Sequence, residues 1–472
     1  MLRLLQFSTR FNYRYLPVQL GIMATFACMP FWLRMPYAAF TYDPLYGMGF
    51  LITLPIIWTI LTWLLAGMPG FAHIMNNVVR FVFTVAIIAL AVWMWLSVRW
   101  SFMTGHDQPN VAQSAALQFS MIALWVVAVA SAAPPPRFIA SILVFNGIWN
   151  SAIAILQVAN KGAIGLSFLG EFKIAVDASN ANVLLSNGVR WLRPSGLLPH
   201  PNTLAGILLV GLLATTVFIL SEKGLLRRIG IAAAVFILWG FLLTFSRAGI
   251  LGFAAGAFAL LPFIIPYLRI KAVRRAIFIA ITALIFTSGL FFSSYRQLIL
   301  TRAGVGTESV ELRSIADRLI FSLFAYRAVT ESNQNLFFGV GAGNFPWRSS
   351  YYLVETDYDL RGNNVHHVFL SAWVETGLVG YTLFVIALFM GFQAGLQSVT
   401  PRTQKHREAN ALAKDDQIAR AAFLAGVVAL GIVGLFDHYP WTMIQFQALW
   451  WGLLATASVQ VIASKPPSEI KE

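Results

Sequence analysis

The chain has 472 residues, of which 58% are hydrophobic and only 11% are charged, and its formal net charge is +14. A soluble globular domain carries roughly 25% charged residues, so this composition excludes that class and predicts a polytopic membrane protein. In membrane proteins a positive balance reflects basic cytoplasmic loops and anionic ligands, and we therefore expect no nucleic-acid partner.

Twelve apolar runs of about 20 residues are each long enough to cross about 30 Å of hydrocarbon as a helix. The runs are continuous and do not alternate with polar residues, which excludes a transmembrane β-barrel. We predict an all-α polytopic membrane bundle of about 12 transmembrane helices. The predicted spans are Tyr15–Leu33, Leu45–Ala66, Val78–Val98, Gln113–Ala133, Phe138–Ala159, Asn202–Ser221, Ile229–Ser246, Ala248–Leu268, Ala276–Ser294, His367–Phe392, Ala419–Phe436 and Tyr439–Val459.

The distribution of Lys and Arg predicts which helix ends face the cytoplasm. With twelve spans both termini lie on one side, where the connections carry nineteen Lys and Arg. The short loops of the other side carry only Arg34, Arg99 and Arg247. We therefore expect cytoplasmic termini, and no removal of the first span as a signal peptide, because no small-residue cleavage site follows it.

This topology divides the chain into three parts. N-terminal transmembrane helices with an outer loop over 160–201 occupy residues 1–294, and an extracytoplasmic catalytic loop occupies 295–366. C-terminal transmembrane helices and a cytoplasmic tail occupy 367–472. The single cysteine, Cys28, can form no intrachain disulfide, so cysteine usage does not indicate a redox compartment.

Two arginines precede the span that starts at Asn202. The sequence R-W-L-R-P-S-G-L-L-P-H-P-N places Arg190 and Arg193 in a loop that its prolines keep from forming regular helix, and Asn202 is a suitable cap for the next helix. The two arginines could simply extend to lipid head groups. The alternative is that Arg193 faces a cavity and binds an anion.

Arg247 lies in L-T-F-S-R-A-G, a minimal turn between two hydrophobic helices. Arginine at membrane depth is costly unless it is paired or faces water, although at the interface the cost is small. A second arginine near the same surface makes a shared anion a reasonable hypothesis. Phosphate suits this role because the planar guanidinium gives paired, charge-assisted hydrogen bonds.

The large outer loop contains an amphipathic stretch, Glu311–Thr330, in which Ile315, Leu319, Leu323 and Phe324 recur at helical spacing. We expect this helix to lie on the membrane surface and cap the bundle. Its arginines, among them Arg318, could face the site or form solvated ion pairs.

Two further patterns of this loop, and the last outer turn of the chain, bear on binding. The glycines of F-F-G-V-G-A-G-N-F-P lack the strand–helix context and the G-K-[ST] of a nucleotide loop, so they predict close backbone packing. The aromatic and acidic stretch Tyr351–Gly362 is of a kind that lines sugar grooves. Asp437 and His438 mark the last outer turn and could contribute to the rim of a site.

Two adjacent histidines, His366 and His367, stand where polar chain meets a hydrophobic run. Histidine is the side chain best suited to accept a proton near neutral pH, although an interfacial histidine is also common as a structural residue. Neighbouring histidines on a helix point about 100° apart, so a metal site is disfavoured. On a straight helix Glu375 lies about 180° round from His366, and we predict that Glu375 is a packing residue rather than its partner.

Four stretches together resemble the O-antigen ligase/polymerase superfamily, which contains lipopolysaccharide O-antigen ligases, Wzy-type polymerases and bacterial O-oligosaccharyltransferases. In the family's order they are R-P-S-G-L-L-P-H-P-N-T-L-A-G (Arg193–Gly206), T-F-S-R-A-G (Thr244–Gly249), G-V-G-A-G-N-F (Gly339–Phe345) and H-H-V-F-L-S-A-W-V-E-T-G-L-V-G (His366–Gly380). In this register His366 takes the position of the catalytic histidine. The chain departs from the family in having His367 where asparagine is usual, which leaves open which histidine is the base.

The resemblance implies a metal-independent, cofactor-free, inverting glycosyltransferase in the bacterial inner membrane, acting at the extracytoplasmic face. Its donor would be a glycan on a polyprenyl (undecaprenyl) diphosphate, and its acceptor a glycan, lipid A-core or protein. Arg193, Arg247 and Arg318 would bind the diphosphate, because without a metal ion arginines must neutralise that leaving group. His366 would deprotonate or orient the acceptor hydroxyl.

Two other functions fit a similar architecture. A transporter or flippase of a lipid-linked glycan also needs basic residues for the diphosphate, but it needs access from both faces. A glycosyltransferase that polymerises peptidoglycan shares the membrane architecture, but its sequence pattern is not found. Ligase, polymerase and protein-glycosylating enzyme differ in their acceptor, and the sequence does not separate them.

Overall fold

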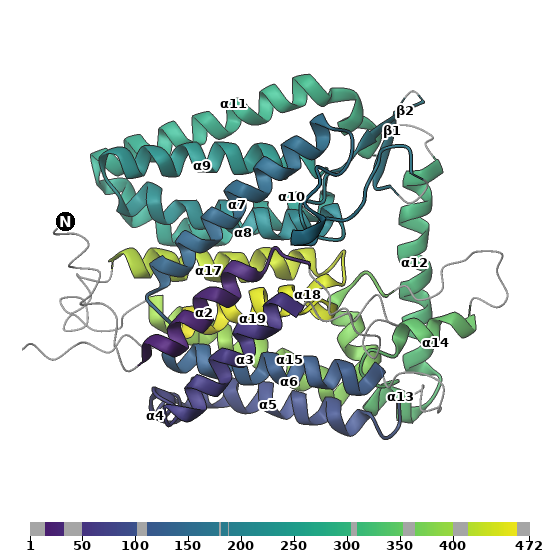
Figure 1. The fold of residues 1–472 in the computed structure, drawn as a ribbon. Helices are drawn as coiled ribbons and strands as arrows, with labels where there is room; N and C mark the ends of the chain where they lie inside the picture. The colour runs from purple at the N-terminus through teal and green to yellow at the C-terminus, as the bar shows by residue number, and fades with distance from the viewer. Residues whose placement is uncertain are drawn as a thin grey trace, which may run out of the picture.

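The computed structural model describes residues 15–32, 50–101, 111–178, 181–186, 188–303, 309–352, 364–399 and 414–459. In these ranges long helices lie roughly parallel, and the chain passes back and forth between two ends of a bundle (Figure 1). We call the end that holds His366 the histidine end, and the end that holds Arg80 the opposite end. Most of the stretch predicted to line a sugar groove, and most basic residues near the termini, lie outside the described residues.

Nine helices in the described ranges are long and apolar enough to cross a membrane. They are α5 (Val78–Ser97), α6 (Val111–Ala132), α7 (Pro136–Ala159), α8 (Pro201–Ser221), α9 (Gly224–Leu243), α10 (Arg247–Ile264), α11 (Lys271–Arg302), α15 (Val368–Val399) and α17 (Lys414–Val433). The prediction of a helical, multi-pass membrane protein is confirmed.

Three shorter apolar helices accompany them, namely α2 (Leu16–Cys28), α3 (Phe50–Leu65) and α19 (Ile444–Ser458). Each of the twelve predicted runs therefore contains a helix. The number of membrane spans stays a prediction, because these three helices have only 13, 16 and 15 residues. The remaining helices are α4 (Phe71–Met75), η3 (Ser167–Leu169), η4 (Ile265–Arg269), α12 (Ser309–Thr330), α13 (Asn333–Phe338), α14 (Phe345–Tyr352) and α18 (Tyr439–Thr442).

One hairpin departs from the all-α prediction. Strand β1 (Val183–Ser186) pairs antiparallel with β2 (Val189–Leu192), and the turn between them includes Gly188, whose φ is +75°. Arg190 braces the hairpin by donating hydrogen bonds to the carbonyls of Val176 and Ala178. Arg190 is thus a structural residue of the loop that leads to α8.

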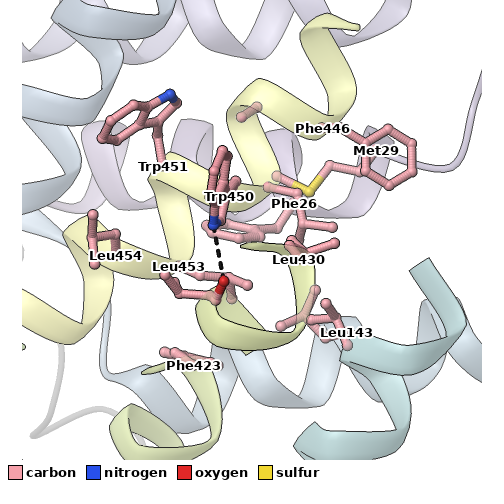
Figure 2. Close-up of a cluster of buried hydrophobic side chains, with 14 of the residues drawn as sticks. Phe26, Met29, Leu143, Phe423, Leu430, Phe446, Trp450, Trp451, Leu453 and Leu454 are labelled. Carbon is pink, nitrogen blue, oxygen red and sulfur yellow. Dashed lines mark hydrogen bonds between the residues drawn. The ribbon is translucent and has the colours of Figure 1, made fainter. Parts of the chain in front are cut away.

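The core of the bundle is built from large aromatic and aliphatic side chains. Trp450 of α19 is buried and donates a hydrogen bond from Nε1 to the carbonyl of Val427 at 3.0 Å (Figure 2). Small residues bring helices together where backbones must approach closely. A Cβ atom on Gly252 of α10 would lie 2.7 Å from the carbonyl oxygen of Ala429 in α17. This contact fixes α10 against α17 and so fixes the position of Arg247.

Helix α12 crosses the histidine end of the bundle (Figure 1). Its buried residues are Phe321, Ala325, Ala328 and Val329. Leu319 and Leu323, which were assigned to its apolar face, are 62% and 65% exposed. The periodicity therefore located the helix but not its packed face, because α12 packs through Phe321 and its neighbours and leaves these leucines exposed.

The glycine-rich loop packs against a kink in α15, as its sequence predicted. Gly377 has a φ of +65° inside the helix, and a Cβ there would lie 2.3 Å from the backbone of Phe337. The N–H groups of Val340 and Gly341 donate to the carbonyls of Val374 and Glu375. Only glycine fits such an approach, and the contact holds the outer loop on the helix that follows His366.

Candidate active site

His366 precedes α15, and Asp437 lies in the turn between α17 and α18. His366 Nδ1 is 3.6 Å from Asp437 Oδ1, which is beyond hydrogen-bond distance but close enough for charge attraction. Asp437 is 5% exposed, whereas the His366 side chain is 29% exposed. Because Nδ1 itself is buried, the accessible part of His366 is the remainder of its ring.

His367 has a different task. Its Nδ1 atom accepts a hydrogen bond from the N–H of Leu370 at 3.1 Å, which satisfies one free donor in the first turn of α15. Glu375 is 1% exposed and accepts a hydrogen bond from Trp441 Nε1 at 2.8 Å. The prediction that Glu375 is a packing residue is confirmed, and the geometry favours His366 over His367 as the reactive histidine.

Asp437 is held by protein donors. Its Oδ2 accepts a hydrogen bond from Asn202 Nδ2 at 2.8 Å, and its Oδ1 accepts one from the N–H of His438 at 2.9 Å. Burial alone would raise the pKa of Asp437, but interaction with His366, His438 and His200 holds that pKa well below its usual range. The carboxylate is therefore ionised at neutral pH.

Two further histidines surround this carboxylate. The ring of His438 is tilted against that of His366, with centroids 5.2 Å apart, and its Nδ1 lies 2.8 Å from Thr442 Oγ1. Burial lowers the pKa of His438 to about 4, and burial together with the charge of Arg193 lowers that of His200 to about 3. Both are therefore neutral at pH 7.

The start of α8 differs from the prediction that Asn202 caps it. The cap is His200, whose Nδ1 accepts from the N–H of Asn202, and Pro201 occupies the first helical position. Proline suits that position because its missing N–H would have no partner there. The Asn202 side chain is thereby released from capping and turns to Arg193 and Asp437.

Arg193 is buried, with 6% of its surface exposed. Its Nη2 donates to Asn202 Oδ1 at 2.8 Å, and its Nε donates to the carbonyl of Thr244 at 2.8 Å. The direct phosphate contact predicted for Arg193 stays a prediction. In the present arrangement Arg193 joins the loop before α8 to the T-F-S-R turn.

Gln157 of α7 supports the same loop from the other side. Its Oε1 accepts from the N–H groups of Ser195 and Gly196, and its Nε2 donates to Glu171 and to the carbonyl of Gly196. Gly196 has a φ of +61°. The buried amide thus fixes the turn that carries Arg193 to its place.

The T-F-S-R turn presents Arg247 on the first turn of α10. Phe245 has a φ of +49°, uncommon for a non-glycine residue, and Ser246 caps α10 by accepting from the N–H of Gly249. Arg302 at the end of α11 donates from Nε to the carbonyl of Phe245, and Arg247 donates from Nη1 to the carbonyl of Arg302. These two bonds tie the T-F-S-R turn to the end of α11.

A cavity of about 390 Å³ opens beside this turn, and we call it the arginine cavity. Its lining includes the predicted site residues Arg247 and Arg318, together with Arg302, which the sequence did not single out. The lining residues are Asn202, Ser246, Arg247, Ala248, Leu251, Arg302, Arg318, Leu319 and Phe436. The cavity adjoins the histidine, because Asn202 is hydrogen-bonded to Asp437 and Phe436 precedes Asp437 in the chain.

His366, Asp437 and His438 have potential metal-binding atoms that all lie within 4.8 Å of one another. However, both Asp437 oxygens already accept hydrogen bonds and His438 Nδ1 is next to Thr442. The trio is organised by protein contacts that a metal ion would have to displace. The expectation of a metal-independent site stays a prediction.

Comparison with known protein families finds a match over the part of the chain that holds most of the candidate site residues. Residues 232–385 match the family model described as O-antigen ligase, a range that includes Arg247, Arg302, Arg318 and His366. No curated protein matches the chain significantly. This match supports the resemblance of the chain to the O-antigen ligase/Wzy-type polymerase superfamily.

Proposed function

We propose that the protein is a membrane glycosyltransferase that transfers a glycan from an undecaprenyl-diphosphate carrier to an acceptor hydroxyl, as an O-antigen ligase or polysaccharide polymerase. The observation that carries this proposal is the arginine cavity, joined through Asn202 and Asp437 to His366. An anion-binding pocket next to a proton acceptor is what transfer from a diphosphate requires.

The cavity suits a diphosphate on electrostatic grounds. Ser246, Arg247 and Ala248 line it with the N-terminus of α10, where unpaired N–H groups and the helix dipole give partial positive charge. Arg302 and Arg318 add to that charge. Helix N-termini and guanidinium groups are both well suited to binding phosphate oxygens.

The apolar part of the lining suits a lipid carrier. Leu251, Leu319 and Phe436 are 51%, 62% and 40% exposed, so the cavity borders on apolar surface that faces outward. In a membrane such surface contacts lipid chains. A donor with a diphosphate head and a polyprenyl tail could therefore enter from the bilayer, with its head among the arginines.

The transfer step follows from this placement. His366 accepts the acceptor hydroxyl proton at Nε2, while its Nδ1 faces the ionised Asp437, which stabilises the imidazolium that forms. The acceptor oxygen forms a bond to the anomeric carbon as the bond from that carbon to the diphosphate oxygen breaks. The electron pair leaves with undecaprenyl diphosphate, whose charge the arginines neutralise. Attack opposite the leaving group inverts the anomeric configuration.

We place the histidine end at the extracytoplasmic face of a bacterial inner membrane, with cytoplasmic termini, because the Lys and Arg distribution favours this orientation. A flippase would need a basic site reachable from both faces. At the opposite end, a cavity of about 350 Å³ has no Lys or Arg among the described residues that line it. This asymmetry supports the transferase.

The test is turnover of a synthetic undecaprenyl-diphosphate-linked oligosaccharide by the purified protein, measured as released undecaprenyl diphosphate, with lipid A-core or a second glycan as acceptor. His366→Ala is expected to abolish release. His73→Ala in α4, an exposed histidine at the opposite end, is the matched control and should retain it. Full turnover by His366→Ala would exclude the mechanism.

A further inference from the structure

Asn202 stands where three parts of the candidate site meet. It is the second residue of α8, is 5% exposed, and lines the arginine cavity. Its Oδ1 accepts from Arg193 Nη2 and its Nδ2 donates to Asp437 Oδ2, both at 2.8 Å. One amide thus bridges a buried cation and a buried anion.

The orientation of this amide is determined by its partners. A guanidinium only donates hydrogen bonds and an ionised carboxylate only accepts them, so the oxygen must face Arg193 and the nitrogen must face Asp437. Aspartate at 202 could accept from Arg193 but could not donate to Asp437. Leucine could do neither.

The backbone under Asn202 is fixed as well. Its N–H donates to His200 Nδ1 at 3.1 Å, and Gln157 braces the preceding turn through the N–H groups of Ser195 and Gly196. The side chain therefore needs little rearrangement to hold both partners, which is the condition for a residue that positions a catalytic group.

We infer that Asn202 is a positioning residue that holds the Asp437 carboxylate in the orientation at which it faces His366. Asn202 thereby keeps His366, the proton acceptor, correctly placed relative to the arginine cavity. This inference rests on the proposed function. Asn202 acts through Asp437 and takes no part in bond making or breaking.

A consequence concerns the proton affinity of His366. The charged and titratable groups around it are Asp437 and His438 from the turn before α18, and His200 from the loop that leads into α8, where Arg193 acts on His200. When Asn202 no longer donates to Asp437, more of the carboxylate charge faces His366. The imidazolium is then stabilised in the resting enzyme, so His366 loses its proton only at higher pH.

The experiment compares Asn202→Asp and Asn202→Leu with Thr216→Val, a control in the same helix whose hydroxyl donates to the carbonyl of Leu213 and whose side chain does not line the cavity. For both Asn202 variants kcat should fall about 10- to 100-fold, with less than about a threefold change in KM for the oligosaccharide donor. A donor-independent readout is the pH dependence of His366 modification by diethyl pyrocarbonate, followed by mass spectrometry. Its midpoint should move to higher pH, and furthest in Asn202→Asp.

The double variant Asn202→Asp/Asp437→Asn separates positioning from stability. It restores a hydrogen bond between positions 202 and 437 and keeps one carboxylate in the pair, but it moves that carboxylate from position 437, which faces His366, to position 202, which faces Arg193. We expect recovery of thermal stability without recovery of kcat. Recovery of kcat as well would overturn the inference, because any bond between the two positions would then suffice.

The same assay distinguishes failure of the inference from failure of the proposed function. If His366→Ala abolishes turnover while Asn202→Asp keeps both the kcat and the His366 titration of the unchanged protein, the inference is wrong and the function stands. If His366→Ala turns over donor normally, the proposed function fails. The diethyl pyrocarbonate titration still tests the link from Asn202 to His366 in that case.

Discussion

Both ends of the bundle hold buried or half-buried arginines, but one group lies at a helix C-terminus and the other at a helix N-terminus. At the opposite end Arg80 and Arg420 are 7% and 3% exposed, and they donate to the carbonyls of Ser458, Ala457 and Val459 at the C-terminus of α19. A cation at a helix C-terminus is favoured by free carbonyls and by the helix dipole. At the histidine end Arg247 stands at the N-terminus of α10, where the dipole disfavours it.

Under the proposed function, this difference separates structural arginines from those that would bind the diphosphate. Arg80 and Arg420 complete the hydrogen bonding of a helix end, so their charge is accounted for within the fold. Arg247, Arg302 and Arg318 gather positive charge around a cavity and a helix N-terminus. By burial alone, Arg80 and Arg420 would be the stronger candidates for an anion-binding site. The helix dipole reverses this order, because a helix N-terminus attracts anions and a helix C-terminus does not.

The largest effect is expected from Arg247→Lys. Lysine keeps the charge but loses the planar fork that binds two phosphate oxygens, so donor turnover should fall about 100-fold or more. The melting temperature should change little. Released undecaprenyl diphosphate and thermal unfolding of the same preparation measure the two quantities, and retention of full turnover by this variant would place the diphosphate elsewhere.

Arg420→Leu provides the contrasting case. It removes the donor of the Ala457 and Val459 carbonyls, and buried carbonyls without a partner should lower the free energy of unfolding by about 2–3 kcal/mol. The turnover number of the folded fraction should be unchanged. A loss of turnover without a loss of stability would show that the two ends do not differ in the way described.

Arg302→Gln should have an intermediate effect. Glutamine can still donate to the carbonyl of Phe245, but the positive charge next to Arg247 is lost. We expect about a tenfold fall in kcat/KM for the donor, and a weaker dependence of donor binding on salt concentration. Steady-state kinetics at two ionic strengths measure both, and an unchanged salt dependence would remove Arg302 from the anion site.

The histidine end should also be the acid-sensitive end. The folded-state pKa values of His200 and His438, about 3 and about 4, lie below the unfolded value of about 6.5, so their contribution to stability is complete above pH 6.5. That contribution is lost as the pH falls toward the folded values. Thermal unfolding at pH 7 and pH 5 should show a decrease of roughly 1–2 kcal/mol per histidine.

The His200→Asn variant tests this assignment, because asparagine is also a good helix cap but does not titrate. Its stability should depend less steeply on pH than that of the unchanged protein. An equal dependence would assign the acid sensitivity to other groups.

The smallest effect is expected from chelation. If His366 serves as a base beside Asp437, treatment with EDTA should leave donor turnover unchanged. Turnover that EDTA abolishes and an added divalent metal ion restores would instead assign His366, Asp437 and His438 to a metal site.

Much of the bundle and part of the site could be predicted from the sequence. Hydropathy located the helices because spans of hydrocarbon length leave a continuous apolar signal. Arg247 stood out because a charge in a short turn between apolar helices needs a reason. Helical spacing separated Glu375 from His366, and Glu375 does pack on Trp441.

The remaining partners depend on tertiary contacts that leave no local signal. The predicted run ended at Ser294, but α11 continues through a kink at Tyr295 and carries Arg302 to the T-F-S-R turn. The helical spacing of Leu319 and Leu323 does not reveal which face of α12 packs on the bundle. Asp437 meets Asn202 across 235 residues of sequence, a contact that only the fold brings about.

The most direct test of the central claim, that the lipid diphosphate binds among the arginines of the histidine end, is photo-crosslinking with a photoreactive undecaprenyl-diphosphate analogue. The purified protein would be labelled and the crosslinked peptides identified by mass spectrometry. We predict labelling of the segments around Leu251 and Leu319, and loss of that labelling in Arg247→Lys. Labelling instead around Phe263 and Tyr267, in the cavity of the opposite end, would contradict the account.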